Sequence, residues 1–398
     1  MSVPTPRDVL VVGGGPAGAA AAIFLRARGH DVLLVDEARF PRDKVCGEGV
    51  SPEAWRLLAE MGADGDVRAL RPHPLRGMTL TSPDGTSFSG AYRGPREAGF
   101  AVRRLALDAC LLQVARRSGV EVHEGVRATS LIREGARVAG VVTANGAGEV
   151  PVRARLVVAA DGRRSMVARQ LGLLREHRRL RKFAVRGYWS GVEGLAEQGE
   201  MHVAAGGYCG IAPLGPAEAN VAFVIDRAEM QPSGGDLEGF YRATLSRWPR
   251  IAERLARARL LEPPRAVGPL ALEARRVSVP GAALVGDAAG FYDPFTGEGV
   301  TLALRGAEIL AGVADRVLRG GDASLEEYDR LRAEATRDKF RLNRLLQRVV
   351  AWPALANAVA RRLARRGDLG DRLVGIAGDF VPARTALDAR FVFDLIRA

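Results

Sequence analysis

The chain has 398 residues, of which 47% are hydrophobic and 26% charged, and its formal net charge is +12 at pH 7. That length suits two packed domains, because single cores stop growing near about 250–300 residues. The positive charge comes from scattered arginines and only three lysines (Lys44, Lys182 and Lys339), a skew typical of codon bias in a GC-rich genome. No nucleic-acid-binding motif accompanies it, so we expect no nucleic-acid partner.

The three cysteines, Cys46, Cys110 and Cys209, are widely spaced and form no CxxC pair. This spacing predicts no metal site, iron–sulfur cluster or disulfide framework, and it fits a reducing cytoplasm. The first expected strand begins within about eight residues of Met1, which leaves no room for a signal peptide. No apolar run reaches the ~18 residues of a membrane-spanning helix. We therefore expect a cytoplasmic protein, and the sequence predicts no particular oligomeric state.

Residues 8–25 carry the motif around which the chain is organised. An apolar run from Val9 to Val12 leads into Gly13-x-Gly15-x-x-Gly18 and an alanine-rich helix former. Such glycines allow a tight turn, a close approach of the backbone to a pyrophosphate, and close helix–strand packing. A second expected strand, 31–35, ends at Asp36-Glu37, near the spacing at which an acid binds a ribose. The motif in this context predicts a dinucleotide site; the alternative is a tight turn and nothing more.

The next part of the chain alternates between helix and strand patterns. A hairpin turns at Pro83-Asp84-Gly85, and a helix of about fourteen residues follows Arg103. We expect strands at 99–102 and 120–123, a three-segment meander at 127–132, 137–143 and 150–155, and a separate buried strand at 156–160 that ends in Asp161-Gly162.

From residue 182 the pattern changes to consecutive strands. We expect strands at 183–190, 200–204 and 220–226, with a glycine-rich block at 206–215 between the last two. A helical stretch at 236–259 follows. This part predicts a separate antiparallel sheet that covers a site.

A second specific pattern follows the expected strand 282–285. It reads Gly286-Asp287, continues through a glycine-rich loop, and opens a helix that runs to about Leu318. A flavin needs a carboxylate for its ribityl hydroxyls and a positive helix end near its ring, and this pattern supplies both. The alternative, an ordinary helix N-cap, explains Asp287 but not the glycines and the proline after it.

The loop from Phe40 to Pro52 contains two basic residues, a cysteine and two glycines. The functional interpretation puts Cys46 against the reactive ring of the cofactor. The alternative is a buried cysteine that acts as a small hydrophobic residue, and the residues alone favour neither.

The C-terminal part, 324–398, is expected to be helical and basic. Leu345–Arg366 mixes apolar residues with arginines at helical spacing. A packed tail with a solvated basic face is the favoured interpretation. Peripheral association with a membrane through these helices is the alternative.

Together these blocks resemble the flavoprotein superfamily of para-hydroxybenzoate hydroxylase, and within it the geranylgeranyl reductase family. The resemblance spans residues 8 to about 310. It is carried by Gly13–Gly18 with Asp36, by Arg42-Asp-Lys-Val-Cys46-Gly47-Glu-Gly, by Arg104 with Asp108, by Asp161-Gly162 and Gly286-Asp287, and by Pro294-Phe-Thr-Gly297-Glu-Gly299.

The resemblance implies non-covalent FAD, NAD(P)H as a transient electron donor, and a set of cofactor-binding positions. Arg104 would reach the phosphate–ribityl region and Asp287 the ribityl chain. Cys46 and Tyr208 are the candidate catalytic residues. The implied cofactor-binding residues are Gly13, Gly15, Pro16, Ala17, Gly18, Asp36, Glu37, Arg42, Cys46, Gly47, Arg104, Val126, Asp161, Gly162, Gly286, Asp287, Pro294, Gly297, Gly299 and Val300.

One segment departs from the family pattern. Geranylgeranyl reductases carry Tyr-x-Trp-x-Phe-Pro in the substrate sheet, whereas this chain has Tyr208-Cys-Gly210-Ile-Ala212-Pro213. Two large aromatic residues are replaced by small ones, which implies a wider pocket and argues for a bulkier substrate than a slim polyprenyl chain. The related tryptophan halogenases carry a Trp-x-Trp-x-Ile-Pro segment and a lysine that are not matched, which argues against halogenation.

We therefore expect an α/β protein with a Rossmann-like, para-hydroxybenzoate hydroxylase-like FAD/NAD(P)-binding domain (1–72, 98–175 and 268–322). A substrate domain with an antiparallel sheet (73–97 and 176–267) and a helical C-terminal region (323–398) complete it. The leading function is FAD-dependent reduction of a carbon–carbon double bond in a hydrophobic small molecule. The alternatives are a monooxygenase that hydroxylates a phenolic or polyketide-like ring and, as a different class, a non-redox prenyl- or lipid-binding flavoprotein.

Overall fold

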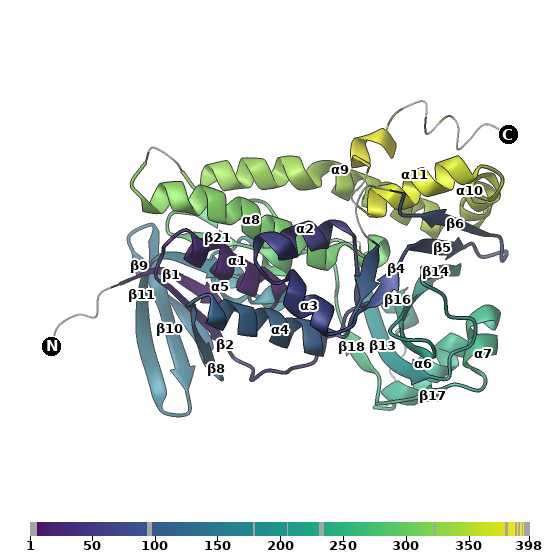
Figure 1. Cartoon of the computed structure of the whole chain (residues 1–398), viewed down its shortest axis with the longest axis horizontal. Coiled ribbons are helices and arrows are strands. Elements are labelled where there is room, and N and C mark those ends of the chain that lie inside the picture. Colours follow the sequence, from purple (N-terminus) through teal and green to yellow (C-terminus); the bar gives the residue numbers. More distant parts are fainter. Residues whose placement is uncertain are drawn as a thin grey trace.

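The computed structural model describes residues 6–93, 98–177, 180–204, 206–230, 235–321, 324–378 and 381–386, with 388, 391 and 393. Residues 1–5 of the expected FAD-binding domain, 94–97 of the expected substrate domain and those beyond 393 in the expected C-terminal region lie outside the described residues. Two large sheets stand side by side, joined along one flank by the longest helix (Figure 1).

The first sheet is built around short apolar strands that are buried on both faces of the sheet. Its strand order is β20-β21-β11-β1-β2-β8, and β21, β11, β1, β2 and β8 run parallel. The strands are β1 (Arg7–Val12), β2 (Val32–Asp36), β8 (Glu121–Glu124), β9 (Arg127–Glu134), β10 (Arg137–Asn145), β11 (Gly148–Ala159), β20 (Ser278–Val279) and β21 (Ala282–Leu284).

The expected meander and the expected buried strand after it turn out to share a strand. β11 is twelve residues long; its first half pairs with β10 in the meander and its second half pairs with β1 in the parallel sheet. The predicted boundary at Leu156 was therefore wrong, because the backbone stays extended from Arg153, which pairs with β10, to Ala154, which pairs with β1.

The second sheet has the order β17-β13-β16-β15-β14-β5-β6, with β18 also paired to β13. The glycine-rich block at 206–215 supplies a strand of its own, β15. The strands are β5 (Gly77–Thr81), β6 (Ser87–Ala91), β13 (Lys182–Ser190), β14 (Gly199–Ala204), β15 (Gly207–Pro213), β16 (Glu218–Asp226), β17 (Arg259–Leu260) and β18 (Arg265–Val267). Smaller sheets join β3 (Gly49–Val50), β7 (Gly99–Ala101) and β4 (His73–Leu75), and β12 (Leu174–Glu176) with β19 (Leu272–Ala274).

Helices cover both sheets, and α9 runs along the top of Figure 1 from one to the other. α1 packs against α8 and α4 in the first core, and α10 and α11 pack on β6. The helices are α1 (Pro16–Ala27), α2 (Glu53–Glu60), α3 (Asp64–Ala69), α4 (Arg104–Arg117), α5 (Met166–Gln170), α6 (Leu237–Ser246), α7 (Pro249–Leu255), α8 (Gly299–Leu318), α9 (Glu326–Ala351), α10 (Pro353–Arg365) and α11 (Gly367–Ala377).

Short 3₁₀ turns follow several strands: η1 (Gly162–Arg164), η2 (Arg227–Glu229), η3 (Gly286–Ala289), η4 (Pro294–Thr296) and η5 (Ala383–Ala386). The helical stretch expected at 236–259 is two helices, α6 and α7. Pro249 begins the second one, because its ring is compatible with the first turn of a helix but not with the interior. No helix in the described part of the chain is long and apolar enough to cross a membrane.

Candidate active site

One continuous cavity of about 1020 Å³ runs from the carboxyl ends of the parallel strands to the face of the second sheet. In open α/β sheets, ligands bind at this edge. All but one of the residues that the resemblance assigned to the cofactor line this cavity, and so does Tyr208. The exception is Gly18, which packs behind the turn.

The turn between β1 and α1 has no space for side chains at two of its glycines. Gly13 has φ +103°, and a Cβ there would lie 2.5 Å from the carbonyl oxygen of Ala160. A Cβ on Gly18 would lie 1.8 Å from the carbonyl oxygen of Gly13. Gly15 is the N-cap of α1, and Gly15, Pro16 and Ala17 line the cavity, so the N-terminus of the helix lies at the cavity. These features fit the pyrophosphate of a dinucleotide.

Two arginines stand over this helix end. The guanidinium groups of Arg42 and Arg104 lie 3.4 and 4.0 Å from where a Cβ of Gly15 would be. Buried Asp108 orients both, with bonds of 2.6 and 2.8 Å from Arg104 and 2.9 Å from Arg42. Burial opposes the charge of Arg104, but Asp108 and Cys46 outweigh it, so the pKa of Arg104 is raised. The site therefore keeps fixed positive charge for phosphate oxygens.

The end of β2 supplies the adenosine side of the cavity. The Asp36 carboxylate accepts the N–H of Gly14 at 2.6 Å and that of Ala38 at 2.8 Å, and the Asp36 carbonyl accepts the N–H of Val126 at 2.9 Å. Glu37 is exposed at the rim, 3.9 Å from Arg127. The position of Asp36 is thus fixed by the main chain on both sides.

The flavin side is formed where β11 and β21 end. Asp161 accepts the N–H of Met166 at 2.7 Å, while its Oδ1 is buried without a partner among the described residues. Burial raises the pKa of Asp161. Gly286 has φ +63°, and Asp287 beside it lines the cavity. Beyond them, the loop with Pro294, Gly297, Gly299 and Val300 lines the cavity up to the start of α8.

The loop that carries Cys46 lies between the two sheets. Sγ of Cys46 accepts the N–H of Glu48 at 3.4 Å, and Asn220 on β16 donates to the Cys46 carbonyl at 2.9 Å. Glu48 is buried, and its Oε1 accepts the hydroxyl of Tyr188 and the N–H of Arg104 at 3.1 Å. Burial raises the pKa of Glu48, and these hydrogen bonds only partly oppose it.

A second set of contacts fastens the same loop to β13. Arg186, fully buried, bonds Asp43 at 2.6 Å and Glu262 at 3.1 Å. The ring of Tyr188 lies between the guanidinium groups of Arg103 and Arg186, at 4.0 and 4.1 Å from its centroid. We call the contacts of Arg186, Tyr188 and Asn220 with this loop the sheet–loop clamp.

The substrate side of the cavity follows the alternation of β15. Tyr208, Gly210 and Ala212 line the cavity, whereas Cys209 packs in the core between the second sheet and helices α6 and α7. Ile211 belongs to that core and also lines the cavity. The chamber is mostly apolar, because it is also lined by Leu75, Met78, Ala184, Met201, Ala222, Val224, Val267, Leu270, Phe291 and Phe295.

Tyr208 belongs to a hydrogen-bonded group centred on Asp293. Its hydroxyl donates to Asp293 at 2.5 Å, and Asp293 also accepts Lys182 at 3.3 Å and the N–H of Phe295 at 3.0 Å. Asn343 of α9 donates to the Asp293 carbonyl at 3.1 Å. Burial raises the pKa of Tyr208, and the nearby charge of Asp293 raises it further. Burial also raises the pKa of Asp293, and the charge of Lys182 opposes this increase. The tyrosine therefore stays protonated and joins the substrate sheet to the cofactor loop.

Sequence reasoning missed Lys44, Glu48 and Asp293 as site residues, although all three line the cavity. Each lies inside a segment that the resemblance quoted or within one residue of it. The available signal was a charged residue within a glycine-rich loop, but nothing in the sequence separates such a residue from a solvated one.

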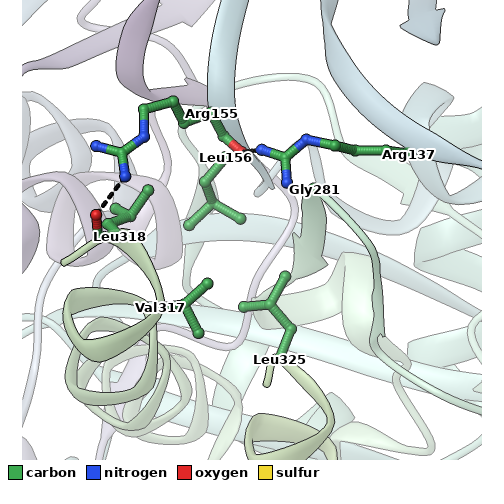
Figure 2. A pocket seen from close by; sticks show the side chains of 7 residues that line it. All are labelled: Arg137, Arg155, Leu156, Gly281, Val317, Leu318 and Leu325. Carbon is green, nitrogen blue, oxygen red and sulfur yellow. Dashed lines mark hydrogen bonds between the residues drawn. The ribbon is translucent and has the colours of Figure 1, made fainter. Parts of the chain in front are cut away.

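A second cavity, of about 180 Å³, lies by the other end of the parallel part of β11. Figure 2 shows that its two cations face main-chain oxygens: Arg155 bonds the carbonyl of Leu318, and Arg137 bonds the carbonyl of Arg155. The cavity is also lined by the apolar side chains of Leu156, Val317 and Leu325. We interpret this cavity as a packing gap.

Comparison with known proteins agrees with this geometry. A family model described as "FAD binding domain" matches residues 7–341. Digeranylgeranylglycerophospholipid reductase of Methanosarcina acetivorans is 32% identical over 333 residues, covering 81% of this chain and 78% of that protein. Menaquinone reductase of Mycobacterium tuberculosis is 33% identical over 335 residues, covering 79% and 78%. The solved structure of a myxobacterial chondrochloren halogenase is 26% identical, with a TM-score of 0.80 and 98% of each chain covered.

These findings confirm the fold, the cofactor and the resemblance expected from the sequence. The family model spans the dinucleotide cradle and the second sheet together, and both reductases match most of the chain. The chain therefore belongs to the FAD binding domain family, in its geranylgeranyl reductase group, and is an FAD-dependent oxidoreductase.

Proposed function

We propose that this protein reduces a carbon–carbon double bond in an amphiphilic small molecule that carries an apolar chain. The observation that carries the proposal is the single cavity lined by the cofactor cradle, by Cys46 and by the apolar residues of the second sheet. The relatives named for reduction of a geranylgeranyl lipid and of menaquinone support this reaction class. When bound, reduced FAD supplies hydride chemistry at this junction.

The chamber suits a substrate with a ring or a bulky head. Gly210 and Ala212 leave open the space that two large side chains would fill in the reductase segment described above. A slim chain alone would leave voids there and lose contact energy. From the chamber the cavity continues along α8 and α9, past Leu302, Ile309, Ala335 and Phe340, which suits an apolar tail.

In the proposed reaction, different residues of the cavity bind the cofactor, deliver the proton and orient the substrate. Gly13, Gly15, Pro16 and Ala17 hold the pyrophosphate with Arg42 and Arg104, Asp36 binds the adenosine ribose, and Asp287 binds the ribityl chain. Gly297, Gly299 and Val300 lie under the ring. Cys46 lies where the ring meets the substrate, and a proton is delivered to the substrate at or near it. Tyr208, held by Asp293, orients the substrate.

The test is anaerobic. The enzyme is reduced with one equivalent of dithionite or NADPH and mixed with menaquinone or a geranylgeranyl lipid, and flavin reoxidation and product mass are recorded. We expect reoxidation and a product that still carries two added hydrogens after exposure to air, which oxidises a menaquinol back to the quinone but leaves a reduced carbon–carbon bond. A product formed only with oxygen and carrying an added oxygen would establish the monooxygenase instead. A product carrying bromine or chlorine, when oxygen and halide are supplied, would establish a halogenase, the activity of the solved structure above.

We also propose that the protein docks on the cytoplasmic surface of a membrane through α9 and α10. Trp352, between these helices, is 69% exposed, and Leu345 of α9 and Leu355 of α10 are exposed too. Arg344 and Arg348 belong to the same helix, α9, as Leu345, and they act electrostatically on Tyr292, which lines the cavity. An apolar tip within a basic face suits anionic lipid. Flotation with anionic vesicles should decrease in Trp352→Glu and stay unchanged in Trp189→Phe, whose ring is buried.

A further inference from the structure

Lys44 extends into the cavity, yet it has no assigned role. In the described part of the chain, its ammonium group has no hydrogen-bond or ion-pair partner within 4 Å. A Cβ on Gly162 would lie 3.0 Å from Nζ, and Asp287 is the acid that acts on it most strongly. A cation in such a setting is available for a ligand.

The order of the strands indicates which part of FAD Lys44 meets. The sheet runs β21-β11-β1-β2, with the ribose acid at the end of β2 and the phosphate turn at the end of β1. FAD must therefore cross the edge from β2 toward β21. Gly162 follows β11 and Asp287 follows β21, so Lys44 lies beyond the phosphate turn, on the ribityl–flavin side.

The pyrophosphate already has its own cations. Arg42 and Arg104 stand over Gly15 and are held there by Asp108. Lys44 lies on the same cavity wall but belongs to neither of these ion pairs. Lys44 is therefore a separate cation from the two that stand over the phosphate turn.

The use of lysine in this chain is a second, independent observation. Arginine carries nearly all the positive charge, and only three lysines occur. All three lie at or beside this cavity: Lys44 and Lys339 line it, and Lys182 bonds Asp293, which lines it. Lysine is a compact point charge whose pKa shifts readily, whereas arginine keeps its charge in nearly all settings. Lys44 is therefore a cation whose charge can respond to its surroundings.

We propose that the Lys44 ammonium binds the flavin half of FAD and stabilises the negative charge of the reduced ring, so that Lys44 sets the reduction potential of the bound cofactor. Two electrons and one proton convert the neutral ring to its reduced anion. The electrons come from dithionite or from a nicotinamide donor, and Lys44 keeps its own proton. The inference rests on FAD binding and not on the identity of the substrate.

The test compares the midpoint potential of bound FAD in wild type and in Lys44→Met, with the dissociation constants of oxidised and reduced FAD. We expect Lys44→Met to bind oxidised FAD almost as well as wild type and to bind reduced FAD about ten- to one-hundred-fold more weakly. At about 30 mV per tenfold for a two-electron couple, the midpoint potential falls by about 30–60 mV. Lys44→Arg keeps the charge and should restore most of the shift.

Arg42→Met is the matched control. It removes a cation from the phosphate side, so it should weaken both redox states equally and leave the potential unchanged. If Lys44→Met instead behaves like Arg42→Met, Lys44 is a phosphate ligand and the proposal is wrong. An unchanged potential with unchanged binding overturns it as well. None of these measurements uses the substrate, so a failed search for double-bond reduction leaves this test intact.

The wild-type protein provides a check that needs no variant. Burial lowers the pKa of Lys44, and Asp287 only partly opposes this; Arg104 and Arg42 lower it further and Asp108 raises it. As pH rises through that lowered pKa, the ammonium loses its charge, so the wild-type potential should converge on that of Lys44→Met. Parallel pH profiles of the two proteins would contradict the proposal even if the variant bound FAD poorly.

Discussion

The cofactor cradle and the substrate chamber share one cavity but are built in different ways. The cradle is made by main-chain groups and by glycines from short segments, such as Gly13–Gly18. The chamber is made by single side chains from strands and helices far apart in the sequence, such as Met78, Tyr208 and Phe295. Main-chain recognition depends on local spacing, whereas side-chain recognition depends on how the whole chain folds. Changes in the chamber should therefore alter activity and leave FAD binding intact, and changes in the cradle should do the reverse.

Gly210→Trp tests that separation with the largest expected effect. A Cβ at Gly210 meets only ordinary contacts, the nearest at 3.6 Å, so the strand tolerates it while the indole fills the chamber. We expect turnover of the native substrate to be abolished and FAD content to be unchanged. Gly215→Trp, which has open space around it, is the control. Normal turnover in Gly210→Trp would mean that β15 does not line the substrate site.

Cys46→Ala tests the junction between the two regions. If Cys46 donates or positions the proton, substrate turnover should slow by about 10²-fold or more, the low end for general acid catalysis. FAD content should stay as in wild type. Cys110, a half-buried free cysteine on α4 that does not line the cavity, provides the matched Cys110→Ala control. Full activity in Cys46→Ala would leave Cys46 with a packing role only.

Asp36→Ala tests the cradle. Loss of a hydrogen bond to a charged group should weaken FAD by about 1.5–3 kcal/mol, or roughly ten- to 150-fold in Kd, as measured by quenching of FAD fluorescence. Turnover at saturating FAD should persist. Asp31→Ala, an exposed acid just before the same strand, should leave Kd unchanged. An unaltered Kd in Asp36→Ala would remove Asp36 from the ribose site.

Glu200→Gln has the smallest expected effect and concerns the stability of the chamber. Burial raises the pKa of Glu200, but His202, at 2.9 Å, and Arg254 outweigh it, so the pKa is lowered. A carboxyl with a lowered folded pKa stabilises the protein above its unfolded pKa and loses this contribution as pH falls. The melting temperature of the variant should therefore be a few degrees below that of wild type at pH 7. This difference in melting temperature should become smaller below about pH 4. Glu193→Gln, at an exposed site, is the control.

The same contrast explains what could be predicted from the sequence. The glycine spacing and the acids Asp36 and Asp287 predicted the cradle, because each motif acts through its own backbone. The alternation of Tyr208, Gly210 and Ala212 predicted one face of the chamber. The partners of Tyr208 and Glu48 could not be predicted, because Asp293 is 85 residues away from Tyr208 and Tyr188 is 140 residues away from Glu48. Those contacts exist only once the two sheets are side by side.

The sheet–loop clamp has a consequence for how this fold diversifies. Tyr188 and Asn220 face each other across β13 and β16, and with Arg186 they fasten the loop that carries Lys44 and Cys46. Substitutions on β15 can change specificity without disturbing this fastening. A chimaera that takes the whole second sheet from another relative also takes that relative's fastening residues. Domain exchange between relatives should therefore succeed only when residues 41–49 are exchanged together with the sheet.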